Sequence, residues 1–209
     1  MKKVVVFGAG LVVRAHVRYL LDNGFAVTVA SRTVSKAEVI VDGHPNGTPM
    51  AFDIEKDPDK LATIIAEHDL AVSLLPWQFH AQVARACLDT GKHMVTTSYV
   101  KDDMTALDAE AKAKGIILLN ELGVDPGIDH MTAMKVIHEV QAKGGTITTF
   151  QSFCGGLPAP EANDNPYGYK FSWSPRGVLL AGLNESRYRR DATVKDFPGE
   201  ELFDHVLEV

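Results

Sequence analysis

The stretch VVVFGAGLVV, residues 4–13, decides the fold. Four apolar residues precede a Gly-x-Gly turn, and an apolar pattern with helical spacing follows it. Gly8 permits a tight turn, and Gly10 lets a pyrophosphate approach the N–H groups at the start of a helix. Val13 replaces the third glycine of the motif, which governs helix–strand packing, so we expect a wider contact there. The alternative is a glycine turn in a fold that binds no dinucleotide. The predicted contacts in this turn are Gly8, Gly10, Leu11, Val12 and Val13.

The composition excludes several classes of protein. The 209 residues carry a formal net charge of −6, and no Lys/Arg-rich run occurs, so we expect no nucleic-acid partner. No apolar stretch is long enough to span a membrane, and we expect no membrane partner. The two cysteines lie far apart and match no zinc spacing, so we predict no metal site and a reduced, cytoplasmic setting.

Short apolar segments alternate with helical patterns through about residue 125. Runs that are apolar without alternation are typical of parallel strands covered on both faces, and regular spacing by helices indicates βαβ units. We therefore predict an α/β, Rossmann-type doubly wound parallel sheet. The expected strands are residues 4–7, 27–30, 51–53, 70–75, 93–97 and 116–120, and the expected helices between them include 11–23, 58–68, 79–90 and 102–114.

The pattern changes after the sixth strand. A helix is expected over 129–141, a half-exposed antiparallel strand over 146–154 and a helix over 176–183, followed by a polar tail. The turn-rich segment 155–169 is too long for an ordinary connection, which favours a functional role. We predict a dinucleotide-binding domain at 1–127 and the start of a second, α+β substrate or dimerisation domain at 128–209.

The end of the second strand indicates which dinucleotide binds. An NAD site has an Asp or Glu about 20 residues after the glycine turn. This chain has Ser31, Arg32 and Thr33 there instead, and an arginine can pair with a 2′-phosphate. NADP(H) is therefore favoured over NAD(H), although Arg32 can also be a surface turn residue. Asp53 and Leu75 follow other strands and are expected beside the cofactor.

Polar clusters end three further strands, at residues 96–99, 120–130 and 153–158. Ligands of parallel sheets bind outside the carboxyl ends of the strands. Each cluster also has a structural interpretation: Thr and Ser are common turn residues, Asp129 is a good helix N-cap, and Cys154 can be a small buried hydrophobe. His80 and His130 lie near the expected cleft, but a single histidine is weak evidence for a ligand.

The whole set of motifs resembles the NADP-dependent, L-glutamate-forming saccharopine dehydrogenase family. The resemblance rests on the glycine turn, on VTTSYV at 95–100, NELGVDPGIDH at 120–130, CGGLPAPE at 154–161 and NPYGYKFSWSPRGV at 165–178. It covers nearly the whole chain. It implies an oxidoreductase acting on the CH–NH bond of saccharopine, which joins L-glutamate and α-aminoadipate semialdehyde through an imine that NADPH reduces.

The resemblance also implies roles for individual residues. Substrate contacts are expected at Ser98 and Tyr99. Tyr99, Asp125 and Cys154 are the candidate catalytic residues. The carboxylate of Asp125 would favour the protonated, more electrophilic imine. Besides the first turn, the implied cofactor contacts are Ser31, Arg32, Thr33, Asp53, Ile54, Leu75, Thr97, Val124, Asp125, Pro126 and Trp173.

The length differs from that family. Its members are much longer, and the groups that hold the distal carboxylates of saccharopine are expected beyond Val209. We therefore expect a truncated N-terminal portion that binds NADPH and turns over poorly. A carboxyspermidine-type dehydrogenase and a non-catalytic NADP-binding fragment are the alternatives, and a homodimer is also expected because truncation exposes apolar surface.

Overall fold

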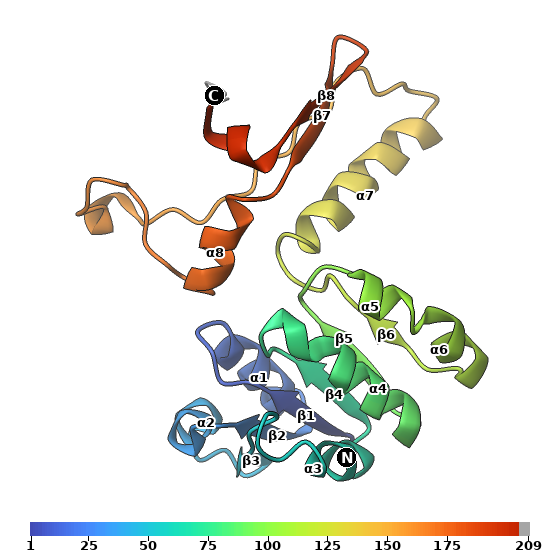
Figure 1. Ribbon diagram of the computed structural model, residues 1–209, viewed down its shortest axis with the longest axis vertical. Helices are drawn as coiled ribbons and strands as arrows, with labels where there is room; N and C mark the ends of the chain where they lie inside the picture. Colours follow the sequence, from blue (N-terminus) through green and yellow to red (C-terminus); the bar gives the residue numbers. More distant parts are fainter. Residues whose placement is uncertain (205–209) are drawn as a thin grey trace. The chain divides into compact units, whose positions relative to one another are not determined.

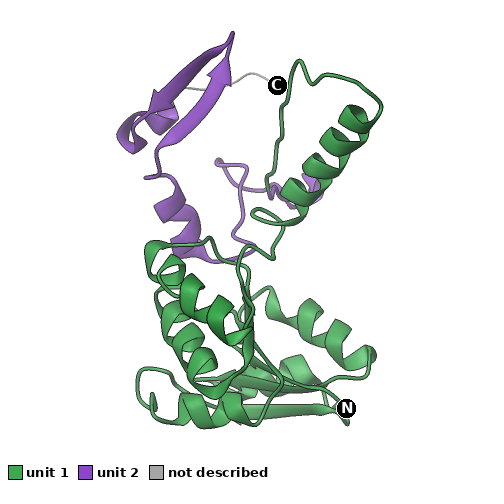
Figure 2. Cartoon of the chain, turned by 90° about the vertical axis from the view of Figure 1, so that its right-hand side faces the viewer, with its two compact units in different colours: residues 1–155 green, residues 156–209 purple. Residues whose placement is uncertain are grey.

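The computed structural model describes residues 1–204. The chain forms two compact units, Met1–Gly155 and the residues after Gly155 (Figure 2). The parallel sheet lies entirely in the first unit (Figure 1). The domain boundary expected between residues 127 and 128 stays a prediction.

Within the described residues, the first unit contains a six-stranded parallel sheet with the strand order β3-β2-β1-β4-β5-β6. This is the order of the doubly wound dinucleotide-binding fold, so the predicted fold class is confirmed. The strands are β1 Lys3–Phe7, β2 Ala26–Ser31, β3 Gly47–Ala51, β4 Leu70–Ser73, β5 His93–Thr96 and β6 Leu118–Leu119.

Helices cover both faces of this sheet (Figure 1). On β1, Val4 and Val6 face the core beneath α1 and α2, whereas Val5 and Phe7 face the core beneath α3, α4 and α6. All four side chains are at most 2% exposed, which explains why the strand is apolar without alternation. The helices of this unit are α1 Val13–Asp22, α2 Val34–Val41, α3 Lys60–Ala66, α4 His80–Thr90, α5 Asp102–Thr105, α6 Asp108–Lys114 and α7 Ile128–Ala142, with a short 3₁₀ turn η1 at Trp77–Phe79.

The direction of winding reverses at β1. This strand pairs with β2 on one side, where Phe7 aligns with Ala30, and with β4 on the other, where Phe7 aligns with Ser73. A crevice opens outside the carboxyl ends of the strands at such a switch point. The turn after β1 therefore lies where the fold binds its ligands.

Two predicted elements of the sheet domain were placed wrongly. The third strand is Gly47–Ala51 rather than 51–53, because Gly47 and Pro49 hide the strand pattern and an edge strand tolerates proline. The helix expected over 102–114 is two helices. The N–H of Leu107 bonds to the oxygen of Met104 at 3.0 Å, a three-residue step that interrupts the helix.

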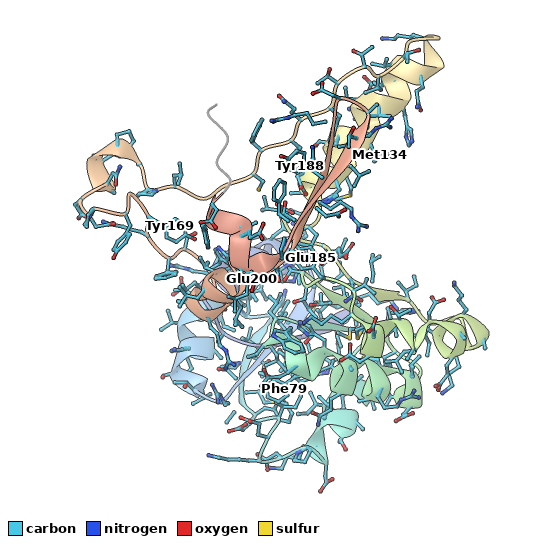
Figure 3. The ribbon with its side chains drawn as sticks, turned by 45° about the horizontal axis from the view of Figure 1, so that its top comes forward. Phe79, Met134, Tyr169, Glu185, Tyr188 and Glu200 are labelled. Carbon is cyan, nitrogen blue, oxygen red and sulfur yellow. The ribbon has the colours of Figure 1, made fainter. Side chains whose placement is uncertain are left out.

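The antiparallel strand expected over 146–154 is also absent from the described part of the chain. These residues are exposed and pair with no strand there, so no ladder of hydrogen bonds stabilises them. The preceding helix α7 carries exposed apolar side chains, among them Met134 (Figure 3).

The second unit begins with a 3₁₀ turn, η2 Pro160–Ala162, and the helix α8 Pro175–Ala181, where Ser174 Oγ caps the N–H of Gly177 at 3.1 Å. The expected polar tail contains a hairpin of β7 Ser186–Arg190 and β8 Thr193–Phe197, and η3 Gly199–Asp204 follows. The ring of Tyr188, labelled in Figure 3, is stacked on that of Phe197. The turn residues Asp191 and Ala192 both have positive φ, and Asp-Ala is a weak signal for such a turn. Among the described helices, none has the length and apolarity needed to cross a membrane.

Candidate functional site

The turn after β1 requires glycine at its first position. Gly8 has a φ of +116°, and a Cβ there would lie 2.7 Å from the carbonyl oxygen of Leu74. The N–H of Gly8 donates to the oxygen of Ala30 at 2.9 Å. The turn is thus held between β2 and the end of β4, as the glycine motif predicts.

The residues after Gly8 present backbone donors. Within the described structure, the N–H groups of Leu11 and Val12 make no hydrogen bond, and a Cβ on Gly10 would meet no protein atom within 4 Å. The N–H of Val13 donates to the oxygen of Gly10 at 3.3 Å, and its side chain is 1% exposed in the core beneath α1. Free N–H groups at a helix N-terminus with open space before them suit a pyrophosphate.

A cleft of about 360 Å³ lies at the switch point. It brings together eight of the sixteen predicted cofactor residues, which follow the ends of β1, β2, β3 and β4. Its lining comprises Gly8, Ala9, Gly10, Ser31, Arg32, Thr33, Lys36, Phe52, Asp53, Ile54, Glu55, Leu74, Leu75, Pro76, Gln78 and Phe79.

The β2 end of this cleft suits a phosphate. Arg32 and Ser31 line it, and the guanidinium of Arg32 is exposed and 3.7 Å from a carboxylate oxygen of Glu55. Asp53 is turned to its own loop, where its Oδ1 accepts the N–H of Glu55 at 3.1 Å. Among residues 1–204, the cations that line the cleft are Arg32 and Lys36. Two cations and a serine hydroxyl are the groups that a 2′-phosphate needs.

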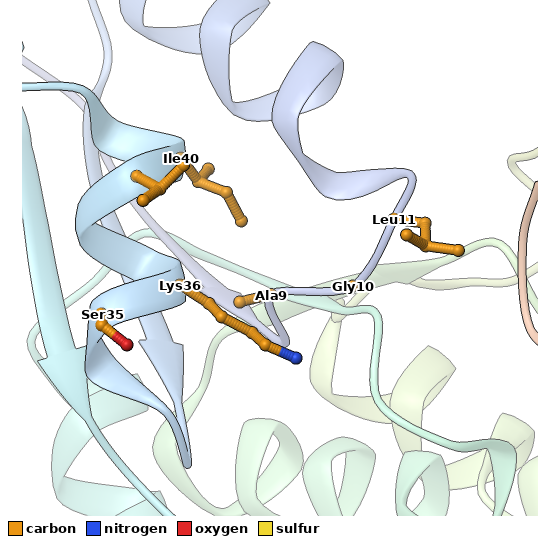
Figure 4. A pocket seen from close by; sticks show the side chains of 7 residues that line it. Ala9, Gly10, Leu11, Ser35, Lys36 and Ile40 are labelled. Carbon is orange, nitrogen blue, oxygen red and sulfur yellow. The ribbon is translucent and has the colours of Figure 1, made fainter.

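Lys36 was missed in the sequence. It lies on α2 and also lines a neighbouring hollow of about 440 Å³ with Ala9, Gly10 and Leu11. Figure 4 shows its side chain extending toward the backbone of the glycine turn. The sequence feature that could have identified Lys36 is its position four residues after Arg32, about one helical turn into the segment that follows β2.

A second group of predicted residues follows β5 and β6. Ser98 and Tyr99 form the loop after β5, and Asn120 holds it by donating from Nδ2 to the oxygens of Ser98 and Tyr99 at 3.4 and 3.5 Å. Glu121 Oε1 accepts the N–H of Val100 at 3.1 Å. The polar run after β6 therefore fixes the backbone that carries the two predicted substrate residues.

The loop of residues 123–130 folds back on itself. The N–H of Gly123 donates to the oxygen of Pro126 at 2.9 Å, and the Asp125–Pro126 peptide bond is cis. Gly127, with a φ of +147°, lies against Gly123 so closely that a Cβ would collide with its carbonyl. Asp129 is not the N-cap, because Gly127 takes that position; its Oδ1 instead accepts the N–H of Gly127 at 3.1 Å.

Several carboxylates lie near Tyr99 and Cys154, around the loop of residues 123–130. Partial desolvation, then the carboxylates of Asp125, Asp129 and Glu121, raise the pKa of the Tyr99 phenol, which stays protonated at neutral pH. Partial desolvation, then Asp125 and Asp129, also raise the pKa of the exposed Cys154 thiol. The three predicted catalytic residues, Tyr99, Asp125 and Cys154, thus lie close enough to interact electrostatically.

Ligand atoms of Asp125, Asp129 and His130 lie within 4.8 Å of one another. His130 Nδ1 and Asp129 Oδ1 are 2.8 Å apart in a hydrogen bond. No metal was expected here from the sequence, and exposed carboxylates gather in this way without one, so we assign this group no ion.

His80 lies between the two sites and was assigned no role from the sequence. Its ring is 3% exposed, with Nδ1 2.8 Å from Ser73 Oγ and Nε2 2.7 Å from Ser98 Oγ. Desolvation by burial lowers its pKa to about 4, although Asp103 acts in the opposite direction. The imidazole is neutral at physiological pH. Its signal was weak, because a single histidine at a helix start has many structural uses.

The remaining predicted residues differ in position. Thr97 and Val124 are exposed, and Pro126 is buried in the loop after β6. Trp173 lies in the second unit, where its ring packs over Gly177 at the start of α8. The functional roles predicted for these residues stay predictions.

Comparisons with known proteins identify the family. Residues 4–119 match the saccharopine dehydrogenase NADP binding domain, and residues 123–209 match the saccharopine dehydrogenase C-terminal domain. The first match supports NADP(H), the cofactor expected from Ser31, Arg32 and Thr33.

Individual relatives agree. The saccharopine dehydrogenase [NADP(+), L-glutamate-forming] of Pyricularia oryzae is 49% identical over 96% of this chain and 44% of its own length, and that of Saccharomyces cerevisiae is 41% identical over 96% and 45%. The mitochondrial alpha-aminoadipic semialdehyde synthase of Bos taurus is 40% identical over 95% of this chain and 21% of its own length.

A solved structure of the apo, histidine-tagged S. cerevisiae saccharopine dehydrogenase (L-Glu forming) superposes with a TM-score of 0.84 at 40% identity, over 96% of this chain and 45% of that one. The chain thus spans less than half the length of the saccharopine dehydrogenases that it matches. Sequence, domain matches and structure agree, and the chain belongs to the saccharopine dehydrogenase family.

Proposed function

We propose that this chain carries the NADP(H)-binding site and the adjoining reaction face of an oxidoreductase that acts on the CH–NH bond of saccharopine. The reaction joins L-glutamate and α-aminoadipate semialdehyde with loss of water, and reduction of the resulting imine gives the secondary amine. In the reverse direction the amine is oxidised to the imine, which water hydrolyses. The observation that carries the proposal is the cluster of Ser98, Tyr99, Asp125 and Cys154 beside a cleft lined by phosphate-binding groups.

NADPH, when bound, would supply the hydride for the imine carbon, and the protein would supply the groups that bind the cofactor and stabilise the imine. The N–H groups at the start of α1 suit the pyrophosphate, while Arg32 and Lys36 suit the 2′-phosphate. Asp125 is exposed, and its carboxylate is the group proposed to stabilise a protonated imine. Tyr99 keeps its proton at neutral pH and is a candidate donor to the imine nitrogen.

Binding and turnover need separate measurements. We expect the 209-residue chain to bind NADPH more tightly than NADH in a fluorescence titration and to oxidise saccharopine with NADP⁺ slowly, followed by NADPH absorbance. The control is Arg32→Ala, which removes a phosphate-binding group but no predicted catalytic residue.

The alternatives give different outcomes. A carboxyspermidine-type dehydrogenase would reduce imines formed from diamines in preference to those from glutamate. A non-catalytic module would bind NADPH and show no turnover with either. Turnover of the isolated chain at the rate of a family member of full length would contradict the expectation of poor turnover. The expected homodimer is tested by sedimentation equilibrium.

A further inference from the structure

A buried hydrogen-bonded chain connects the end of β4 to the loop after β5. Ser73 ends β4 and is fully buried, and His80 begins α4. The imidazole joins Ser73 Oγ at 2.8 Å to Ser98 Oγ at 2.7 Å. Thr96 Oγ1 lies farther away, 3.4 Å from His80 Nε2, and accepts the N–H of Ser98 at 3.4 Å.

Two arrangements of protons fit this chain, because a neutral imidazole has one donor and one acceptor nitrogen. In the first, Ser73 donates to Nδ1, and the Nε2–H group donates to Ser98. In the second, the Nδ1–H group donates to Ser73, and Ser98 donates to Nε2. The arrangements differ in the direction of the Ser98 proton: it points away from His80 in the first and toward His80 in the second.

The surroundings of Ser73 select the first arrangement. His80 Nδ1 is the hydrogen-bond partner that the described residues offer to Ser73 Oγ, and the side chain is 0% exposed. In the second arrangement the hydroxyl proton of Ser73 would be buried without an acceptor, which is costly. In the first, Ser73 and the imidazole satisfy both of their protons, and the hydroxyl of Thr96 loses only a 3.4 Å contact with Nε2, which is too long for a strong hydrogen bond.

We propose that His80 is a positioning residue: Ser73 fixes its Nε2–H tautomer, which leaves the Ser98 hydroxyl free to donate to a carboxylate of an amino-acid substrate. The proposal rests on the proposed function, which makes Ser98 a substrate residue. An outward donor has a clear use here. Asp125, Asp129 and Glu121 make this face acidic, so a carboxylate substrate needs fixed donors to bind.

A second buried histidine provides an internal control. His68 Nδ1 lies 2.7 Å from the carbonyl oxygen of Ile64, and Nε2 lies 2.8 Å from Thr28 Oγ1. A carbonyl only accepts, so His68 must carry its proton on Nδ1. The two buried histidines should therefore show opposite tautomers in the same sample.

The first experiment is long-range ¹H–¹⁵N NMR of the ¹⁵N-labelled chain at neutral pH, with His80 and His68 assigned by His80→Leu and His68→Leu. We expect a protonated Nε2 and an unprotonated Nδ1 for His80, and the reverse for His68. Ser73→Ala should convert the His80 signals to a mixture of tautomers. A wild-type His80 protonated on Nδ1 would overturn the proposal, and so would signals that Ser73→Ala leaves unchanged.

The second experiment measures saccharopine binding to the chain saturated with NADP⁺, by calorimetry. His80→Leu should weaken saccharopine binding about tenfold, as expected for losing the preset orientation of a hydrogen bond to a charged group. His80→Gln, which keeps an N–H donor, should recover part of the loss. NADP⁺ affinity, measured separately, tests the proposed function. Normal NADP⁺ binding with equal saccharopine affinity in wild type and His80→Leu would refute the positioning role of His80 alone. A wild-type chain that binds NADP⁺ but no saccharopine would refute both the proposed substrate of the chain and the role of His80.

Discussion

Replacing His80 with leucine should change how the stability of the chain depends on pH. Burial lowers the pKa of His80 from its ordinary value of 6.5 to about 4 in the folded protein. Asp103 is the charged group that acts on it, and its carboxylate opposes the shift. The unfolded chain therefore binds more protons than the folded chain between about pH 4 and pH 6.5. The contribution to stability is fully present above the unfolded pKa, and falls as the pH drops through this window.

The size of the effect follows from the two pKa values. Each pKa unit corresponds to about 1.4 kcal/mol, so the full window is worth roughly 3 kcal/mol. Most of this lies between pH 7 and pH 5, where wild type should lose about 2 kcal/mol relative to His80→Leu. Titrating carboxylates and His16, whose pKa burial also lowers, are common to both proteins and cancel in the difference.

Urea unfolding of the two proteins at pH 7, 6 and 5, followed by circular dichroism, measures this difference. His68→Leu is the matched control for removing a buried, hydrogen-bonded histidine. A gap between wild type and His80→Leu that stays constant from pH 7 to pH 5 would refute the reasoning. It would mean that the imidazole is as easily protonated in the folded chain as in the unfolded one.

Other perturbations test the cofactor cleft and the cysteines. Arg32→Ala should weaken NADPH binding about tenfold and leave NADH binding nearly unchanged, measured by fluorescence titration; equal losses for both would contradict a 2′-phosphate role. Glu55→Gln frees Arg32 from its exposed ion pair and should tighten NADPH binding about twofold, and weaker binding would exclude competition between Glu55 and the phosphate. Gly8→Ala should cost about 2 kcal/mol of unfolding free energy or more, because of its φ and the approach of Leu74; Gly24→Ala, where φ is +79° and no atom is near, should cost less. Cys154 is exposed with a raised pKa and should alkylate more slowly than a free thiol at neutral pH, whereas burial raises the pKa of Cys87 to about 12 and it should react only on unfolding; equal rates in the folded chain would be evidence against this.

The central part of the fold was predictable because its residues obey one simple rule. Both faces of β1 are buried, at Val4, Val5, Val6 and Phe7, so its unbroken apolar sequence directly indicates a buried strand. The edge strand β3 was misplaced because an edge tolerates Pro49, which local patterns read as a breaker. The β7–β8 hairpin was missed because Asp191 and Ala192 adopt left-handed conformations that their identities barely favour.

The residues of the candidate site could be predicted from the sequence where they directly follow a strand. Arg32 follows β2 directly, and the cleft does include it. Lys36 and His80 are different, because each reaches its site from a helix, and only the fold shows which way that helix faces. Their neighbours in the sequence carry no motif, so the approach of Lys36 to the glycine turn and the hydrogen bond of His80 with Ser98 depend on tertiary packing.

The position of His80 also bears on how the two sites work together. Gln78 and Phe79 line the cofactor cleft, and the next residue, His80, holds Ser98 (Phe79 is labelled in Figure 3). Three consecutive residues, two at the end of η1 and one at the start of α4, thus contact the two sites, and Ser73, at the end of β4, orients the imidazole between them. Because β4 is hydrogen-bonded to β1 and β5 in the middle of the sheet, this segment has little freedom to move independently. We therefore expect that a ligand which displaces the backbone at Phe79 also shifts the imidazole, and with it the Ser98 hydroxyl proposed to face the substrate.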